Sequence, residues 1–189
     1  MPKNIRETEW IENVLQHLSS LSVGGSTLRS QCAEGGVMSA RNFLRQLSIS
    51  DLSRMDQTQF ARFLQQQTTN LSRKILHPQT GKPNFGAARK VINIFLRTCA
   101  MNKDIYKKFN LKKIEPFLEV PIDRQVVNKI NAIKIENGYR FNLPTAQPFT
   151  IRDLDSTNHR LFQNAASQIA ADMGLYRYEL DIIFWRVED

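Results

Sequence analysis

Apolar residues recur at three- and four-residue steps along most of this chain, the spacing that places them on one face of an α-helix. Residues 7–21 and 158–173 show this pattern most clearly, and Gly174 is a suitable end for the second segment. Another helix is expected over residues 87–101, and further helices are expected after the capping candidates Ser39, Ser50 or Asp51, Asp56 and Asp123. The pattern therefore predicts an all-α protein.

Glycine and proline mark the breaks between these helices. Turns or loops are predicted over residues 22–26, 35–36 and 77–83, and the last of these holds two prolines and a glycine. Residues 137–148 are expected to be irregular, with a short hairpin over 133–141 as the alternative. The apolar tail, 175–187, is expected to be buried.

No internal repeat or linker divides the chain. We therefore expect one compact multi-helix domain over residues 1–189, long enough for a single core or for two small lobes around a groove. Residues 102–113 are predicted to form a basic connector.

Charge is concentrated in one part of the sequence. The whole chain carries 26 Lys and Arg residues against 18 Asp and Glu residues, a net charge of +8. The stretch from Leu71 to Lys113 holds eleven of these basic residues and a single acid, Asp104, so the remainder is slightly acidic. A local field of this kind favours a polyanionic partner, and nucleic acid is the leading class.

Several classes of protein are disfavoured by composition. No window approaches the roughly 18 apolar residues that a membrane span needs, and the first residues contain no apolar signal region. A cytoplasmic protein is expected, nucleoid-associated if the source is bacterial or archaeal. Cys32 and Cys99 lie too far apart in sequence to suggest a disulfide framework. His17, His77 and His159 share no metal-ligand spacing, so neither a metal nor another cofactor is predicted.

Two motifs lie within and just beyond the basic stretch. The first is Gly86-Ala87-Ala88-Arg89-Lys90-Val91-Ile92-Asn93, and the second is Pro121-Ile122-Asp123-Arg124-Gln125-Val126. Together they resemble the hairpin-to-helix step and the Pro-Val-Asp segment of the helix-hairpin-helix DNA glycosylase superfamily. The resemblance covers about 40 of the 189 residues. It implies an all-helical fold with a helix-hairpin-helix element that binds DNA, in which residues 84–101 would form the hairpin-like region.

The resemblance also implies roles for single residues. Lys90 would be the nucleophile that attacks C1′ of a damaged nucleotide, and Asp123 would be the carboxylate that assists departure of the base. The DNA backbone would be held by Gly86, Arg89, Lys74, Lys82, Arg97, Lys107, Lys108 and Arg124. A flipped base would be received by Phe85, Gln125 and Tyr139. The expected partner is duplex DNA with a damaged or modified base, bound by a monomer.

The motifs differ from the superfamily pattern at identifiable positions. Ala88 stands where the second hairpin glycine is usual, and Gln125 replaces a histidine. Lys90 and Asp123 are 33 residues apart, which resembles the archaeal 8-oxoguanine glycosylase branch and suggests an oxidised purine as substrate. No cysteine cluster lies near the carboxyl end, so the iron–sulfur variety is excluded.

Other interpretations of the same residues remain open at this stage. Lys90 is equally consistent with a solvated lysine, and Asp123 with a helix N-cap alone. Most of the aromatic residues, and Trp185 in particular, are expected to be structural, as is Cys99. Two other functions are compatible with the sequence. One is a non-catalytic nucleic-acid-binding module of the same fold, and the other is a helical protein whose basic face meets an acidic protein.

Overall fold

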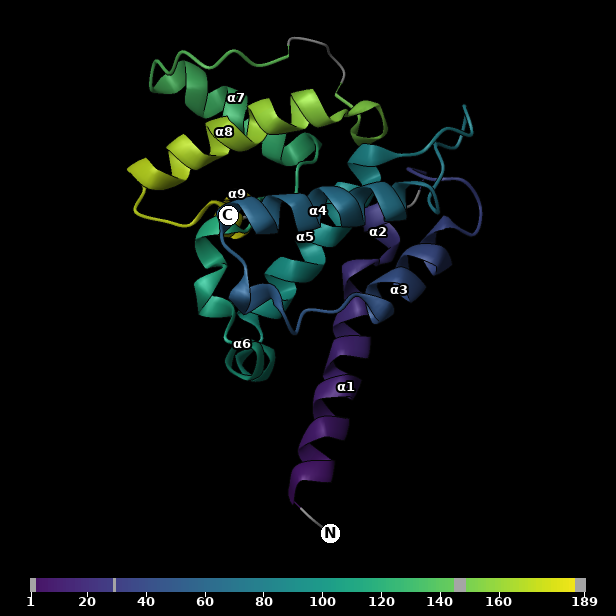
Figure 1. The fold of residues 1–189 in the computed structure, drawn as a ribbon. Coiled ribbons are helices and arrows are strands. Elements are labelled where there is room, and N and C mark those ends of the chain that lie inside the picture. The colour runs from purple at the N-terminus through teal and green to yellow at the C-terminus, as the bar shows by residue number, and fades with distance from the viewer. Residues whose placement is uncertain (1–2, 29, 145–148, 186–189) are drawn as a thin grey trace.

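The computed structural model of the chain describes residues 3–28, 30–144 and 149–185. Across these residues the fold is all-helical, as predicted (Figure 1). Its elements are α1 (Lys3–Ser22), α2 (Gly25–Leu28), α3 (Gly36–Gln46), η1 (Leu52–Arg54), α4 (Gln57–Ser72), α5 (Phe85–Met101), α6 (Lys103–Phe109), η2 (Leu111–Lys113), η3 (Glu115–Phe117), α7 (Arg124–Glu136), η4 (Ile151–Asp153), α8 (Ser156–Asp172), η5 (Arg177–Glu179) and α9 (Leu180–Phe184). The described part of the chain forms no β-strand, and its one extended pairing is an isolated bridge between Leu76 and Pro83.

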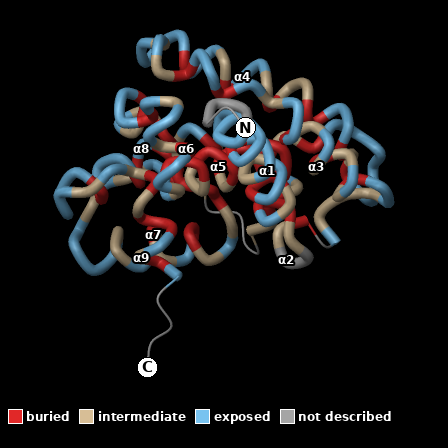
Figure 2. The backbone as a smooth tube through the Cα atoms, turned by 90° about the horizontal axis from the view of Figure 1, so that it is seen from below, coloured by how far each residue is buried: buried red, intermediate tan, exposed pale blue. Residues whose placement is uncertain are grey.

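The buried side chains form two clusters. The larger one joins α1, α3, α4, α5 and α6, with Phe60 and Phe95 among its largest members. The smaller one joins α7, α8 and α9 around Phe162. Figure 2 shows α5 at the centre of the molecule, buried along most of its length. Two cores therefore meet beside one central helix.

Short polar side chains begin several helices, as the sequence predicts. Asp56 accepts a hydrogen bond from the Gln59 N–H at 2.8 Å, and the Gln59 side chain returns one from the Asp56 N–H at 2.9 Å. This reciprocal arrangement is a capping box at the start of α4. Asp123 caps α7 by accepting from the Val126 N–H at 3.0 Å. Both capping predictions are confirmed.

Some boundaries differ from the prediction. The helix expected to start at Ser39 begins at Gly36, after Gly35 in the left-handed conformation. The helix expected from residue 158 begins at Ser156, because Asp155 rather than a later residue caps it. Residues 133–141 form no hairpin, since α7 continues through Glu136 and residues 137–144 are irregular. The rest of the predicted irregular segment, 145–148, lies outside the described residues.

The predicted basic connector, residues 102–113, is largely helical. Asn102 caps α6 by accepting from the N–H groups of Asp104 and Ile105, each at 3.1 Å. Ile105 and Leu111 are buried in the larger core. These two apolar anchors and the cap hold the basic segment against the body, so it is not an extended linker.

The apolar tail is only partly buried. Tyr178, Leu180 and Phe184 pack inward, whereas Ile182 is 44% exposed and Trp185 is 52% exposed. The prediction of a buried tail is therefore confirmed only in part, and Trp185 is not one of its buried residues. Residues 186–187, the end of the predicted tail, lie outside the described part. None of the described helices is long and apolar enough to cross a bilayer.

Candidate functional site

Lys90 and Asp123 form an ion pair between the two cores. The Lys90 Nζ lies 3.2 Å from the Asp123 Oδ2, and the two side chains are 13% and 14% exposed. The sequence motifs thus bring together the two residues to which the resemblance assigns chemistry. Asp123 also caps α7 with its other oxygen, Oδ1, so its two possible roles coexist in one carboxylate.

Local structure explains why Lys90 is held in place. The loop before α5 is folded by His77, whose Nδ1 accepts from the N–H groups of Gln79 and Thr80 at 3.1 and 3.2 Å. Asn84 then caps α5 by accepting from the Ala87 N–H at 3.1 Å. Gly86 lies against η4, where an added Cβ would come within 1.9 Å of the Ile151 carbonyl oxygen. The first turn of α5 is therefore fixed from two sides.

The Lys90–Asp123 pair lies on the wall of a groove of about 780 Å³. One side comes from α5 and from the chain near Gln31, and the other from residues 121–125, 149–152 and α9. Among the described residues that line it, the charged side chains are Lys90, Arg97, Arg124 and Arg152 on the basic side and Asp123 and Asp181 on the acidic side. Arg97 is paired with Asp181, so the groove keeps a surplus of positive charge.

Burial affects two further polar groups of this groove. Removal from water lowers the pKa of the Arg97 guanidinium. The Oε1 atom of Gln31 is buried and accepts no hydrogen bond from the described residues. Gln125 donates to the Phe184 carbonyl at 3.3 Å. Gln31 and Gln125 thus line the same groove as the Lys–Asp pair.

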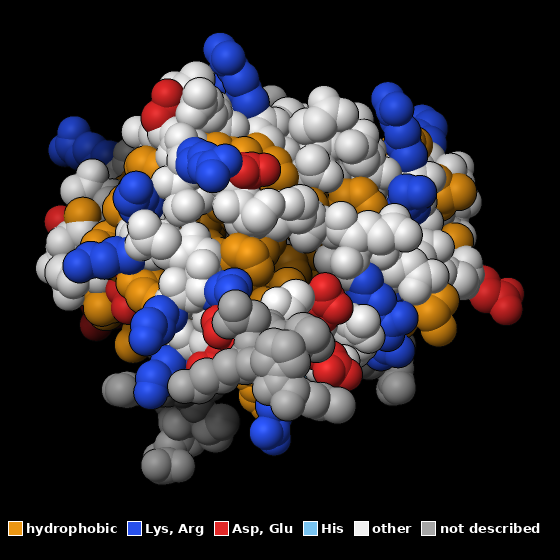
Figure 3. Space-filling view, turned by 60° about the horizontal axis from the view of Figure 1, so that its bottom comes forward, with side chains coloured by type: hydrophobic (Ala, Val, Ile, Leu, Met, Phe, Trp, Pro, Cys, Tyr) orange, Lys and Arg blue, Asp and Glu red, His pale blue; other side chains and the backbone are white. Residues whose placement is uncertain are grey.

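The residues predicted to hold the DNA backbone are dispersed. Lys74 and Lys82 are exposed near the beginning of α5, whereas Lys107 and Lys108 are exposed beyond its end. Because α5 has 17 residues, it separates these two groups by about 25 Å. Figure 3 shows Lys and Arg side chains spread over one face with acidic ones among them. The basic stretch of the sequence is therefore not one continuous surface.

Two other members of that predicted set are buried. Gly86 lies beneath η4, and Arg89 is engaged in an internal ion pair described below. Neither offers a group to solvent in this structure. Arg97 and Arg124 line the groove beside Lys90, and Arg124 is exposed at its edge.

The three predicted base-pocket residues lie in different places. Gln125 lines the groove with Lys90 and Asp123. Phe85 lines another cleft, where its ring meets His159 edge to face with centroids 5.9 Å apart. Tyr139 stacks on Phe141 and donates to Asp172. The structure therefore places one of the three beside the Lys–Asp pair. Trp185 and Phe149 line that groove instead.

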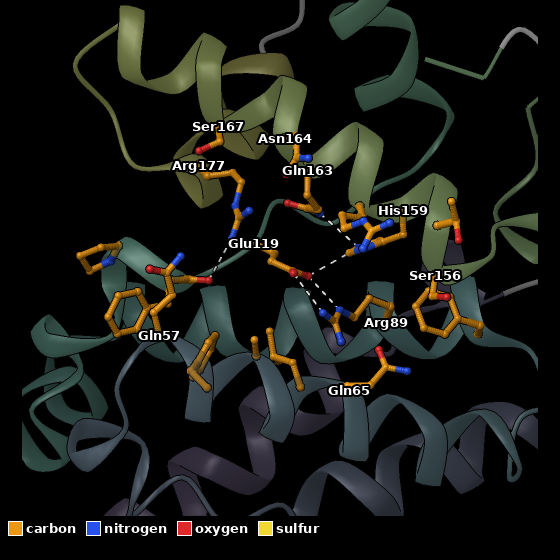
Figure 4. A pocket seen from close by; sticks show the side chains of 18 residues that line it. Gln57, Gln65, Arg89, Glu119, Ser156, His159, Gln163, Asn164, Ser167 and Arg177 are labelled. Carbon is orange, nitrogen blue, oxygen red and sulfur yellow. Dashed lines mark hydrogen bonds and ion pairs between the residues drawn. The ribbon is translucent and has the colours of Figure 1, made fainter. Parts of the chain in front are cut away.

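The sequence interpretation overlooked a second polar cluster, centred on Glu119 (Figure 4). Arg89 binds the Glu119 carboxylate through two hydrogen bonds, Nε–Oε2 at 2.8 Å and Nη2–Oε1 at 3.0 Å. Arg89 also donates to Thr68 Oγ1, and Asn93 donates to Glu119 Oε2, both at 3.0 Å. Two parallel N–H···O bonds of this kind make a strong ion pair with a fixed geometry.

His159 and Gln163 continue the cluster from α8. The Gln163 amide is oriented by the backbone of Val120, because its Nε2 donates to the Val120 carbonyl at 2.6 Å and its Oε1 accepts from the Val120 N–H at 3.3 Å. The second proton on Gln163 Nε2 then points to His159 Nε2, 3.2 Å away. His159 Nε2 also lies 3.5 Å from Glu119 Oε2, so this ring nitrogen faces both the Gln163 amide and the Glu119 carboxylate.

The ionisation of the cluster agrees with these contacts. Burial by itself would raise the pKa of the Glu119 carboxyl, but Arg89, His159 and Arg177 together lower it to about 2. Burial lowers the pKa of His159 to about 4, with Arg89 and Arg177 acting in the same direction against Glu119. The cluster is thus a carboxylate bound by Arg89 beside a neutral histidine.

Weak signals for this cluster were present in the sequence. Arg89 and Asn93 are four residues apart, as are His159 and Gln163, and this spacing places each pair on one helix face. Glu119 stands in a short apolar segment, where a carboxylate needs a partner. These signals indicate burial of polar groups but do not say which helices meet.

Comparison with protein-family models, with curated proteins and with solved structures gives no match. The protein is therefore characterised by its own fold and by the two polar sites described above. It is an all-helical protein with two cores, a Lys–Asp pair in a groove between them, and a second cleft around Glu119.

Proposed function

We propose that the protein is a DNA glycosylase with an associated lyase activity, acting on a damaged or modified base. The observation that carries the proposal is the Lys90–Asp123 pair, 3.2 Å apart, on the wall of a groove of about 780 Å³. An amine and a carboxylate at this distance, partly shielded from water, are the two groups that cleavage of an N-glycosidic bond with a covalent intermediate requires.

Each group has a defined task in the proposed reaction. The bond between the base and C1′ breaks, and the base leaves with the electron pair while positive charge develops on the sugar. The Asp123 carboxylate stabilises that charge. The amine of Lys90 forms a bond to C1′, and the proton it gives up passes by way of Asp123 to the departing base. Opening of the sugar ring then yields a Schiff base, from which loss of a C2′ proton expels the 3′-phosphate.

The walls of the groove support the same proposal. Arg124 and Arg152 add positive charge beside the Lys–Asp pair and suit contacts to phosphate. Trp185 and Phe149 supply rings, and Gln125 supplies an amide. A flipped base needs stacking surfaces and hydrogen-bonding groups of these kinds. By the spacing of Lys90 and Asp123, an oxidised purine is the preferred substrate.

Borohydride trapping tests this proposal directly. The wild-type protein and Lys90→Ala are incubated with duplexes that carry 8-oxoguanine, uracil, an alkylated base or an abasic site. Borohydride reduces a Schiff base to a stable amine, so a covalent protein–DNA adduct is expected with the wild type and none with Lys90→Ala. Lys112→Ala is the matched control, because Lys112 is an exposed lysine that does not line the groove and is not one of the residues predicted to hold DNA, and it is expected to form the adduct normally.

A different outcome would favour the non-catalytic alternative. If no duplex gives an adduct or released base, yet binding weakens steeply as salt rises, the protein is a nucleic-acid-binding module that uses its basic side chains for phosphate contacts. Arg89 and Gly86, which are buried, would take no part in either activity without a change of structure.

A further inference from the structure

The cluster around Glu119 forms the floor of a second cleft, on the other side of α5 from the proposed active site. This cleft has a volume of about 590 Å³, within the range of about 300–1,000 Å³ that is usual for small-molecule sites. Its floor includes Arg89, Glu119, His159 and Gln163, and its walls are α4 and α8 (Figure 4). The proposed glycosylase activity makes no use of it.

The walls carry uncommitted polar side chains. Gln57 and Gln65 project from α4, and Asn164 and Ser167 project from α8. All four are exposed, and their side chains make no hydrogen bond to another described residue. If these two helix faces met only solvent, charged side chains would be as suitable there as amides and hydroxyls. Here the amides and hydroxyls of two helices converge on one cleft.

The charge of the cleft points to an anionic ligand. Arg89 and Glu119 neutralise each other, and His159 is neutral. Arg177 donates Nε to the Leu118 carbonyl at 3.2 Å and Nη2 to the Phe117 carbonyl at 3.0 Å. Glu119 attracts Arg177 as well as Arg89, so these two guanidinium groups share a single carboxylate. Arg160 lines the cleft as well and is exposed. Two guanidinium groups therefore remain to be balanced.

Aromatic rings border the same space. Phe85 and Phe117 are half-buried and line the cleft together with the buried Phe60. A planar ring could pack on these surfaces while its polar edge meets the amides of Gln57, Gln65 or Asn164. Arginine for phosphate, aromatic rings for a base and amides for base edges form one consistent set of contacts.

We infer that this second cleft binds a phosphorylated nucleoside, with its phosphate held by Arg160 and Arg177 and its base against Phe85 and Phe117. The ligand is either a free 5′-nucleotide or the terminal nucleotide of a strand, because both present the same groups. The inference does not rest on the glycosylase proposal, since the cleft shares no lining residue with the Lys90–Asp123 groove.

Isothermal titration calorimetry on the full chain tests the inference. The probes are the four deoxynucleoside 5′-monophosphates, the corresponding nucleosides, inorganic phosphate, and a trinucleotide with and without a 5′-phosphate. At least one monophosphate or the phosphorylated trinucleotide is expected to bind ten times more tightly than its unphosphorylated form and than inorganic phosphate. Tighter binding of the trinucleotide would identify a strand end as the source, and tighter binding of the monophosphate would identify a free nucleotide.

Matched variants locate the binding. Arg160→Glu should weaken it at least tenfold. Arg62→Glu, the same change at an exposed position of α4 outside the cleft, should alter it less than twofold. The inference is overturned if no phosphorylated probe binds, if phosphate alone binds as well as any nucleotide, or if Arg160→Glu and Arg62→Glu have equal effects. Because Lys90→Ala removes the proposed catalysis without touching this cleft, the two proposals fail separately.

Discussion

Arg89 and Lys90 are consecutive residues of α5, yet their charged groups lie in different clefts. Arg89 binds Glu119 at 2.8 Å, and Lys90 binds Asp123 at 3.2 Å. Successive residues of an α-helix point about 100° apart, so the two side chains emerge on different sides of α5. The central helix therefore supplies one member of each ion pair.

The partners of these two residues come from a single short segment. Glu119 and Asp123 are four residues apart, with the buried residues Val120, Pro121 and Ile122 between them. The Arg89–Glu119 ion pair holds this segment against α5, close to the ion pair between Asp123 and Lys90. Glu119 thus joins to α5 the segment that carries Asp123, although it does not itself line the Lys90 groove.

Glu119→Gln should destabilise the protein strongly. The change keeps the shape of the side chain but leaves Arg89 as a buried charge without its counter-ion. Breaking a buried pair in this way costs roughly 3–5 kcal/mol. Urea denaturation at pH 7 measures the loss as a fall in the unfolding midpoint.

An exposed ion pair provides the control for Glu119→Gln. Asp51 and Arg54 are 3.1 Å apart, and their side chains are 64% and 83% exposed. Asp51→Asn should change the free energy of unfolding by less than about 1 kcal/mol. Equal effects of Glu119→Gln and Asp51→Asn would contradict the assignment of Glu119 as a buried structural anion.

Stability should decrease as the pH falls below neutrality, with His159 as a principal cause. The pKa of His159 is about 4 in the folded protein, below the ordinary 6.5. A depressed pKa means that the unfolded chain binds the proton more readily. The stabilisation is therefore complete above about pH 6.5 and is lost as the pH falls toward 4, by up to about 3 kcal/mol.

The variant His159→Gln isolates this contribution. It should flatten the pH dependence of the free energy of unfolding between pH 6.5 and 4, whatever its stability at neutral pH. Glu119 adds a separate loss at lower pH, between about 4.5 and 2, because its folded pKa is about 2. Urea titrations at several pH values measure both slopes. An unchanged slope between pH 6.5 and 4 in His159→Gln would contradict the neutral, buried histidine.

The features that sequence predicts well in this chain are local. Asp56 and Asp123 are recognisable as helix caps because their bonding partners lie three residues further along the chain. The helices that begin at Gly36 and Ser156 start earlier than the sequence predicts. Their first residues depend on which of several candidate caps is used. The prediction that Cys99 belongs to the core is confirmed by its burial.

The features that sequence predicts poorly depend on tertiary packing. A run of basic residues suggests one surface, but α5 lies between Lys82, which precedes it, and Lys107, which follows it in α6. Arg89 turns inward to Glu119. Glu119, 30 residues from Arg89, gives no local sign of that pairing. The proximity of Lys90 and Asp123 could be anticipated only because their two motifs resemble a known family.

Replacement of Gly86 by alanine should disrupt the contact between α5 and η4. The new Cβ would lie 1.9 Å from the Ile151 carbonyl oxygen and 2.8 Å from the Leu154 Cβ. Because backbone atoms cannot move aside cheaply, we expect a loss of about 3 kcal/mol in unfolding free energy. Gly24→Ala is the control, since its nearest neighbour would be 3.5 Å away. Similar thermal midpoints for the two variants would argue against close packing at Gly86.

The two cysteines should react with a thiol reagent at very different rates. Cys99 is fully buried on α5, and burial raises the pKa of its thiol well above the ordinary value. Cys32 is only partly buried, and burial raises its pKa as well. Titration of the native protein with a coloured disulfide reagent should modify at most Cys32, while both thiols should react in denaturant. Rapid reaction of Cys99 in the native protein would show that α5 opens readily.

Asp123→Asn should separate the structural role of Asp123 from its proposed chemical one. Asparagine caps helices about as well as aspartate, so the hydrogen bond to the Val126 N–H can persist and α7 should remain formed. The variant loses the negative charge 3.2 Å from Lys90 Nζ, which the proposed reaction uses to stabilise the developing sugar cation. Loss of one electrostatic partner of this kind lowers rates by roughly 10²–10³. We therefore expect near-normal circular dichroism and a trapping rate at least a hundredfold below wild type.

A second variant, Asp123→Ala, removes the cap as well as the charge. It should in addition cost about 1 kcal/mol of stability through loss of the cap. An Asp123→Asn variant that forms the borohydride adduct at the wild-type rate would leave Asp123 with its capping role alone.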